Sequence, residues 1–134
     1  MPIIVWQESY SVGVAMLDKH HQHLLKLINQ LAEHSACSVH SEQIVDSISE
    51  LTQYAMYHFA CEERLMVEHG FPRLTEHQNE HLQFCEVIAE TSYGATLGVI
   101  STENLLDYLT KWLKNHILHE DMQFKTFFAA KGVN

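Results

Sequence analysis

The chain has 134 residues and a formal net charge of −9; 46% of its residues are apolar and 19% are charged. This is the balance of an ordinary globular protein, and the length predicts one domain over residues 1–134. The negative charge argues against binding to the phosphate backbone of nucleic acid or to an anionic membrane surface.

Neither membrane insertion nor secretion is expected. No stretch approaches the roughly 18 consecutive apolar residues of a membrane-spanning helix, and the N-terminus has no basic region followed by an apolar run. The three cysteines, Cys37, Cys61 and Cys85, are odd in number and match neither a zinc knuckle nor a disulfide framework. A reducing cytoplasm is therefore the expected location.

The first helix is expected over about residues 16–34, after an ordered N-terminal arm of residues 1–15. Its apolar stripe has the three- to four-residue spacing of an amphipathic helix and consists of Leu17, Leu24, Ile28 and Leu31. His21 falls in that row, whereas His20 is placed to one side of it. Periodicity therefore selects His21 as the buried histidine.

The second helix is expected over about residues 41–69, with Ser41 as its N-cap. Two polar residues, His58 and Glu62, interrupt its apolar row one turn apart. The apolar members of the row are Ile44, Ile48, Leu51, Ala55 and Leu65. Gly70 is expected to end the helix, because glycine is favoured just beyond a helix C-terminus.

The third helix is expected over about residues 72–91, with Pro72 in its first turn and with His77 and His81 on the face of its apolar residues. A glycine-containing loop over about 92–102 separates it from the fourth helix, expected over about 103–129. The apolar residues of that helix are Leu109, Trp112, Leu113, Ile117, Phe124 and Phe128, and His116 lies among them.

The pattern predicts an all-α fold, an up-down-up-down four-helix bundle with an N-terminal arm. In this topology the starts of the first and third helices meet the ends of the second and fourth. The polar residues of the apolar faces then lie within about two or three turns of one level. They are His21, His58, Glu62, His77, His81, His116 and a carboxylate at position 120 or 121.

Seven such residues on buried faces predict a metal centre. An imidazole or carboxylate inside a bundle costs several kcal/mol unless it is paired, hydrogen-bonded or metal-bound. Seven ligands are too many for one tetrahedral zinc, and they suit two six-coordinate ions bridged by two carboxylates. The chain has no Glu-x-x-His motif, which weighs against the ferritin-like di-iron bundles. Imidazole is compatible with iron, copper, nickel or zinc, so ligand type does not name the metal.

Spacing leaves the last carboxylate open. Glu120 follows His116 by four residues, the usual same-face spacing, whereas Asp121 follows it by five. On a regular α-helix the five-residue step is about 140° away. Residues alone therefore rank Glu120 and Asp121 as equal candidates.

The sequence resembles the hemerythrins, most closely the single-domain bacterial ones, and the likeness covers nearly the whole chain. The matching stretches are Trp6 with Tyr10–Val14, Leu17–His21 with Leu24, Ile28, Asn29 and Leu31, His58–Glu63, His77-x-x-x-His81, and Trp112-x-x-x-His116-Ile117-x-x-x-Asp121. Family members commonly carry glutamine before the first histidine ligand, where this chain has His20.

The resemblance implies two non-haem iron ions, joined by an oxo or hydroxo bridge, with dioxygen as a reversible ligand. On the family pattern one iron is held by His77, His81 and His116, and the other by His21 and His58. Glu62 and Asp121 bridge them, and a local π-type widening of the helix would bring Asp121 onto the face of His116. The implied hydrophobic oxygen pocket consists of Leu24, Phe59, Trp112 and Leu118.

The expected function is reversible oxygen binding for storage, transport or sensing, without catalysis. The alternatives are a di-iron enzyme that reduces peroxide or nitric oxide or oxidises iron, and an iron-buffering protein. A zinc-protease reading rests on His77-Gln78-Asn79-Glu80-His81, which matches H-x-x-E-H but leaves the other polar residues without a purpose. The chain offers no second domain for signal output, and it identifies no electron donor or oxygen-consuming partner.

Overall fold

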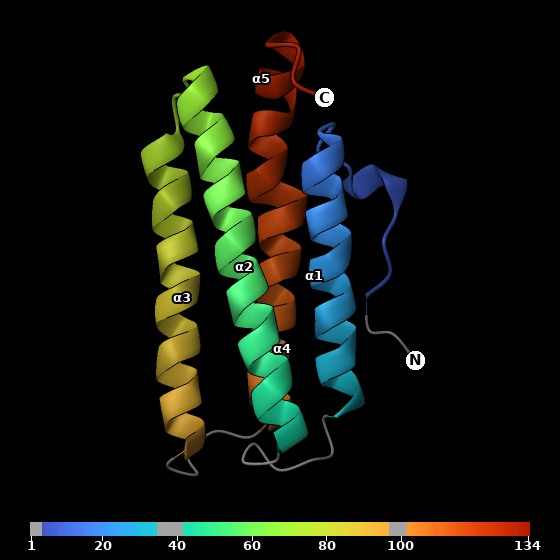
Figure 1. Cartoon of the computed structure of the whole chain (residues 1–134), viewed down its shortest axis with the longest axis vertical. Coiled ribbons are helices and arrows are strands. Elements are labelled where there is room, and N and C mark those ends of the chain that lie inside the picture. Colours follow the sequence, from blue (N-terminus) through green and yellow to red (C-terminus); the bar gives the residue numbers. More distant parts are fainter. Residues whose placement is uncertain (1–3, 35–41, 97–101) are drawn as a thin grey trace.

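Four long helices form the body of the molecule in the computed structural model, which describes residues 4–34, 42–96 and 102–134 (Figure 1). They are α1 (Ala15–Glu33), α2 (Glu42–His69), α3 (Leu74–Thr96) and α4 (Thr102–Asn115). A π-helical segment, His116–Glu120, a 3₁₀ segment, Asp121–Phe124, and the short helix α5, Lys125–Ala130, continue the line of α4. The described residues contain no strand.

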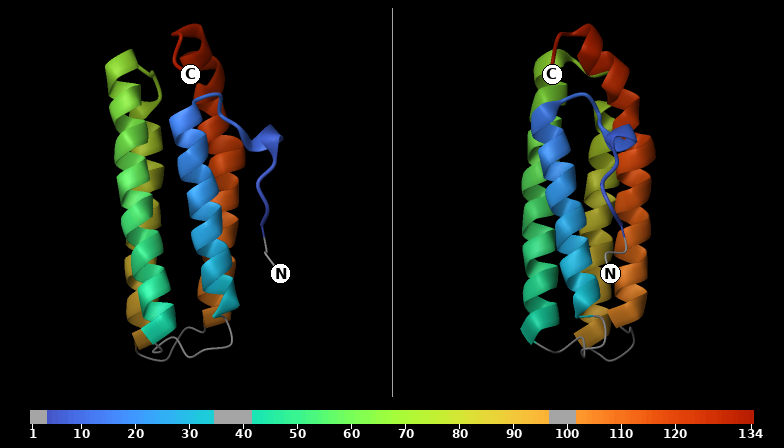
Figure 2. Two further views of the ribbon diagram at one scale, coloured as in Figure 1. Left: turned by 45° about the vertical axis from the view of Figure 1, so that its right-hand side comes forward. Right: turned by 90° about the vertical axis from the view of Figure 1, so that its right-hand side faces the viewer.

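The helices alternate in direction and form the predicted up-down-up-down bundle (Figure 1). Helix α1 packs against α2 and α4, and α3 packs against the same two helices. The N-terminal arm lies along the outside of the bundle beside α1 (Figure 2). The starts of α1 and α3 and the end of α2 therefore lie at one end, together with the segment after α4.

The elements differ from the sequence-based ones in α3, in the N-terminal arm and after Asn115, where the helix expected over about 103–129 continues as π-helical, 3₁₀ and short α-helical segments. Helix α3 begins at Leu74 and runs to Thr96, whereas residues 72–91 were expected. The expected arm contains one 3₁₀ turn, Glu8–Tyr10. The predicted N-cap Ser41 and the middle of the predicted loop, residues 97–101, lie outside the described residues.

Two of the chain reversals, the one after α2 and the one before α1, are explained by nearby residues. Gly70 ends α2 as predicted, with φ +73°, a left-handed conformation that glycine adopts at low cost. At the start of α1, the Asp18 carboxylate accepts hydrogen bonds from the backbone N–H of Val12, at 2.8 Å, and from the hydroxyl of Ser11, at 2.5 Å. Asp18 thereby holds the arm against the first turn of the helix.

The apolar core falls into two clusters along the bundle axis. The larger one spans the end of α1, the first part of α2, the second half of α3 and α4, and it includes Leu24, Phe59 and Phe84. The smaller one lies at the opposite end and includes Leu17, Phe71 and Phe124. A layer of buried polar side chains separates the two clusters.

Candidate metal centre

The buried polar residues gather at a single place in the bundle. Among the described residues, the buried polar or charged side chains are His20, His21, His58, Glu62, His77, His81, His116 and Asp121. Seven of them are the predicted candidates, none more than 3% exposed, and the eighth is His20 at 7%. The structure therefore brings all seven predicted residues together, from α1, α2, α3 and the two segments that follow α4.

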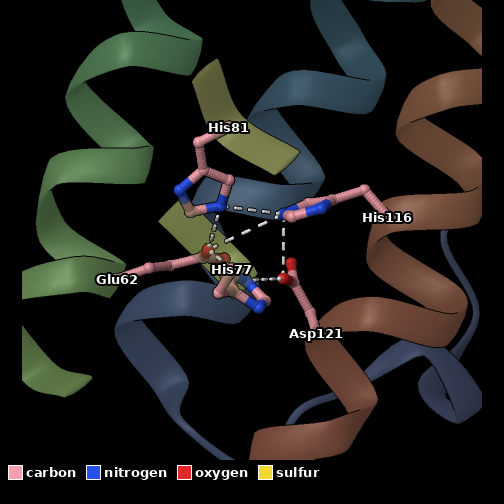
Figure 3. A group of neighbouring side chains, drawn as sticks. All are labelled: Glu62, His77, His81, His116 and Asp121. Carbon is pink, nitrogen blue, oxygen red and sulfur yellow. Dashed lines mark hydrogen bonds and ion pairs between the residues drawn. The ribbon is translucent and has the colours of Figure 1, made fainter. Parts of the chain in front are cut away.

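Three histidines form one side of this cluster together with both carboxylates (Figure 3). The Nε2 atoms of His77 and His116 each lie 2.9 Å from Asp121 Oδ1. His81 Nε2 lies 3.1 Å from Glu62 Oε2. The ligand atoms of these five residues all lie within 4.8 Å of one another, so they could hold one ion.

Two further histidines form the other side with the same carboxylates. His21 Nε2 lies 2.9 Å from Asp121 Oδ2 and 3.3 Å from Glu62 Oε1. His58 Nε2 lies 2.7 Å from Glu62 Oε1. These four residues also have ligand atoms within 4.8 Å of one another and could hold a second ion.

Each carboxylate divides its two oxygens between the two groups. Glu62 turns Oε2 toward the three-histidine group and Oε1 toward the two-histidine group. Asp121 does the same with Oδ1 and Oδ2. All five rings face the carboxylates through Nε2. This is the arrangement of two adjoining sites that share two bridging carboxylates.

A π-helical turn brings Asp121 into the cluster. The segment His116–Glu120 is π-helical, and the wider turn places residues five apart on one face. Asp121 is consequently fully buried beside His116. Glu120 is half-buried and accepts a hydrogen bond from the side-chain amide of Gln123 at 3.2 Å. The choice that spacing left open is resolved by this local widening.

The charges within the cluster compensate one another. Burial alone would lower the pKa of His21 and His77, but the adjacent carboxylates of Asp121 and Glu62 raise both to about 9. For His116, burial is outweighed by the charge of Asp121, which raises the pKa to about 10. Burial acts to raise the pKa of Glu62 and Asp121, yet the surrounding rings hold both well below their usual range. Three of the rings thus accept a proton readily beside the carboxylates, whereas burial lowers the pKa of His58.

Two residues that the sequence-based prediction missed contact the outer nitrogens of the ring cluster. His20 Nδ1 lies 2.9 Å from His58 Nδ1, and Glu63 Oε2 lies 3.1 Å from His81 Nδ1. Placing His20 beside the stripe was wrong, because it is buried against α2. A signal existed, since His20 follows Leu17 by three residues and precedes Leu24 by four.

Aromatic side chains form the wall of the three-histidine group on the side of the larger apolar cluster. Phe59 stacks on His81, with ring centroids 3.9 Å apart, and Trp112 stacks on His116 at 4.7 Å. Leu24 and Phe59 are buried, and Trp112 and Leu118 pack against them in the same cluster. The four predicted pocket residues therefore belong to one apolar cluster next to the rings.

A surface groove reaches the same region from outside. It has a volume of about 430 Å³, lies between α2 and α3, and is lined by residues that include Phe59, Glu63, His81 and Cys85. Cys61 and Cys85 are free thiols, and Cys37 lies outside the described residues.

The zinc-protease reading finds no support in the geometry. His77 and His81 do share a group, but the other members are Glu62, His116 and Asp121. Glu80, which would have to activate water, is paired with Glu120. Burial and the hydrogen bond with Glu120 raise the pKa of Glu80 to about 7.

Comparison with known proteins gives a consistent result over most of the chain. A family model described as the hemerythrin HHE cation binding domain matches residues 12–128. The bacteriohemerythrin of Stenotrophomonas maltophilia is 32% identical over 125 residues, which cover 92% of this chain and 80% of that protein. The myohemerythrin of Riftia pachyptila is 31% identical over 121 residues, 90% of each chain.

Solved structures agree on the fold. The crystal structure of wild-type hemerythrin superimposes with a TM-score of 0.83 at 22% identity, covering 92% of this chain and 96% of that one. Among the described residues, no helix is both long enough and apolar enough to cross a membrane.

Proposed function

The chain belongs to the hemerythrin family, and from this premise we propose that it binds dioxygen reversibly at a pair of non-haem iron ions. Oxygen binding is the function of that family, and the cluster of five histidines and two carboxylates is compatible with a di-iron site. The observation that carries the proposal is the division of oxygens: Glu62 and Asp121 each turn one oxygen to each group of histidines.

The residues fit two ions by the directions of their donor atoms. His58 Nε2 and Asp121 Oδ2 are buried and make no hydrogen bond of acceptable geometry with any described residue. Yet Glu62 Oε1 lies 2.7 Å from His58 Nε2, and His21 Nε2 lies 2.9 Å from Asp121 Oδ2. Atoms that approach so closely without aiming at each other are expected when both aim at a common third point. Imidazole nitrogens and carboxylate oxygens are also suitable ligands for iron.

We assign His77, His81 and His116 to one iron, His21 and His58 to the other, and Glu62 and Asp121 as bridges. The two-histidine iron has fewer protein ligands and would keep the open position. When bound, the iron pair, with its oxo or hydroxo bridge, supplies the redox-active position at which dioxygen binds.

The chain's own residues control access to that position. The seven ligands are at most 3% exposed, and two apolar clusters close the layer from both ends of the bundle. Such surroundings exclude bulk water and set the dielectric around a metal site. We propose that Leu24, Phe59, Trp112 and Leu118 form the apolar side of the oxygen pocket. Their role is to favour release of oxygen over irreversible oxidation.

Hemerythrins are oxygen-binding proteins rather than enzymes, and we propose no catalysis for this chain. The same ligands would serve a di-iron enzyme that reduces peroxide or nitric oxide or oxidises iron. They would also serve an iron-buffering protein. These activities are outcomes of the experiment below. A cytoplasmic location stays a prediction that rests on the cysteine content of the sequence.

The test combines metal content with the visible spectrum. The iron-loaded protein is reduced without oxygen, exposed to air, and then returned to oxygen-free gas. Two irons per chain and a visible band that appears in air and disappears without it are expected. Two irons with immediate, irreversible oxidation would favour the enzyme, and variable, loosely held iron would favour the buffer. One zinc and no colour would contradict the di-iron assignment.

A further inference from the structure

His20 is the one buried polar side chain among the described residues that is not assigned to an iron. Its Nδ1 lies 2.9 Å from Nδ1 of His58. The ring is enclosed on the α2 side by Tyr54 and Tyr57, whose ring centroids lie 5.8 Å and 5.3 Å away. His20 is therefore held in place against the outer edge of a candidate ligand.

The short distance between the two Nδ1 atoms allows only one arrangement of the proton if His58 binds metal. A neutral imidazole carries a proton on one nitrogen and a lone pair on the other. The Nε2 of His58 must present its lone pair to an ion, so its proton must reside on Nδ1. The Nδ1–H then points at His20, whose Nδ1 must offer a lone pair.

The surroundings of His58 Nε2 agree with this assignment. Although Glu62 Oε1 lies 2.7 Å away, the contact does not have the geometry of a hydrogen bond donated by the ring. The Nε2 atom is fully buried within the cluster, whereas Nδ1 has His20 as a well-placed acceptor. The proton of a neutral His58 therefore has its hydrogen-bonding partner on the outer side.

We propose that His20 is a positioning residue, whose Nδ1 accepts a hydrogen bond from His58 Nδ1–H and so fixes the tautomer that leaves His58 Nε2 free for metal. Outer partners of this kind set the ring orientation and the basicity of a ligating histidine. Glu63 is placed to do the same for His81, with a carboxylate as acceptor. The outer hydrogen-bond acceptor is thus a neutral imidazole, His20, in the two-histidine group and a carboxylate, Glu63, in the three-histidine group.

This inference rests on the proposed metal centre and is tested by metal affinity rather than oxygen binding. His20→Gln keeps an acceptor oxygen, and His20→Met has a similar length without one. The matched control is His23→Met, on the next turn of α1. Like His20, His23 packs against Tyr54, with ring centroids 4.2 Å apart, and it is half-buried. Iron(II) is titrated without oxygen into each metal-free protein, and helical circular dichroism reports folding.

The methionine variant is expected to bind iron(II) about 10–100-fold more weakly than wild type, the usual effect of losing such an outer partner. Glutamine at position 20 should restore most of the affinity, and His23→Met should leave it unchanged. Equal affinity of His20→Met and wild type would overturn the proposal. An equal loss in the methionine and glutamine variants would also overturn it, since packing alone would then explain the effect. Should His20→Met fail to fold, His20→Ala takes its place in the same comparison.

These experiments distinguish a failure of the proposed oxygen-binding function from a failure of the proposed positioning role of His20. A wild-type protein that binds iron but shows no reversible visible band contradicts the proposed function, and the comparison of His20 variants remains valid. A wild-type protein that binds no iron contradicts both.

Discussion

Replacing Asp121 by alanine should damage the protein far more than replacing its neighbour Glu120. Asp121 is fully buried, and its oxygens lie 2.9 Å from three rings, those of His21, His77 and His116. Glu120 is only half-buried and interacts with Gln123 and Glu80 outside the cluster. The two variants differ by one position in the sequence and by the π-helical turn in the structure.

The size of the effect follows from the charges left behind. Removing one partner from a buried ion pair costs about 3–5 kcal/mol. The three rings can lose their protons, which limits the loss, so we expect the lower end of that range for the metal-free protein. At about 4 °C per kcal/mol for a domain of this size, the midpoint of thermal unfolding should fall by roughly 12 °C. Stoichiometric iron binding should be lost as well, because Asp121 is assigned to both irons.

The difference should also depend on pH in a defined direction. The pKa values of His21 and His77 are raised to about 9 and that of His116 to about 10. Stability from a raised pKa is fully present below the unfolded value of about 6.5 and is lost as pH rises through the folded value. The difference in free energy of unfolding between wild type and Asp121→Ala, both metal-free, should therefore be large near pH 6.5 and small by pH 10.

Thermal unfolding by circular dichroism at the two pH values, together with iron titration at pH 7, provides the measurement. Glu120→Ala serves as the matched control and should bind two irons with an unfolding midpoint close to wild type. The reasoning is refuted if Glu120→Ala is the more damaging variant. It is also refuted if Asp121→Ala still binds two irons tightly.

Three further predictions concern other parts of the structure. His58→Ala and Glu62→Ala should each abolish stoichiometric iron binding, and normal metal content in either variant would contradict the ligand assignment. Phe59→Ala removes a buried ring stacked on His81, and it should lower the free energy of unfolding in urea by about 3–5 kcal/mol; a loss below 1 kcal/mol would show that the stack adds little. Asn29→Ala removes two hydrogen bonds to the backbone of Ile4, at 2.8 Å and 3.2 Å, each worth about 1 kcal/mol. Proteolysis of the N-terminal arm should become faster in that variant while iron content stays at two per chain, and unchanged cleavage would mean that apolar packing alone holds the arm.

Much of the site could be predicted from the sequence because the spacing of apolar residues identifies the buried face of each helix. A histidine or glutamate inside an apolar row, as at His58 and Glu62, can be read from the period of 3.6 residues. Alternating helix directions then place such residues at one end of the bundle. Spacing left Glu120 and Asp121 equal, and it was the family resemblance that implied Asp121 together with a local widening; the segment His116–Glu120 is π-helical.

The tertiary structure decided what depends on two helices at once. Periodicity gives the direction of a side chain around its own helix, but not the rotation of the neighbouring helix or the rotamer that meets it. His20 has helical spacing from Leu17 and Leu24, but only the packing of α1 against α2 shows that it is covered. The division of carboxylate oxygens between two groups, the inward Nε2 atoms and the contact of Glu63 with His81 likewise depend on distances between helices. Composition and spacing along one chain thus identify most of the residues that are buried together, whereas the packing of helices determines which atoms face one another.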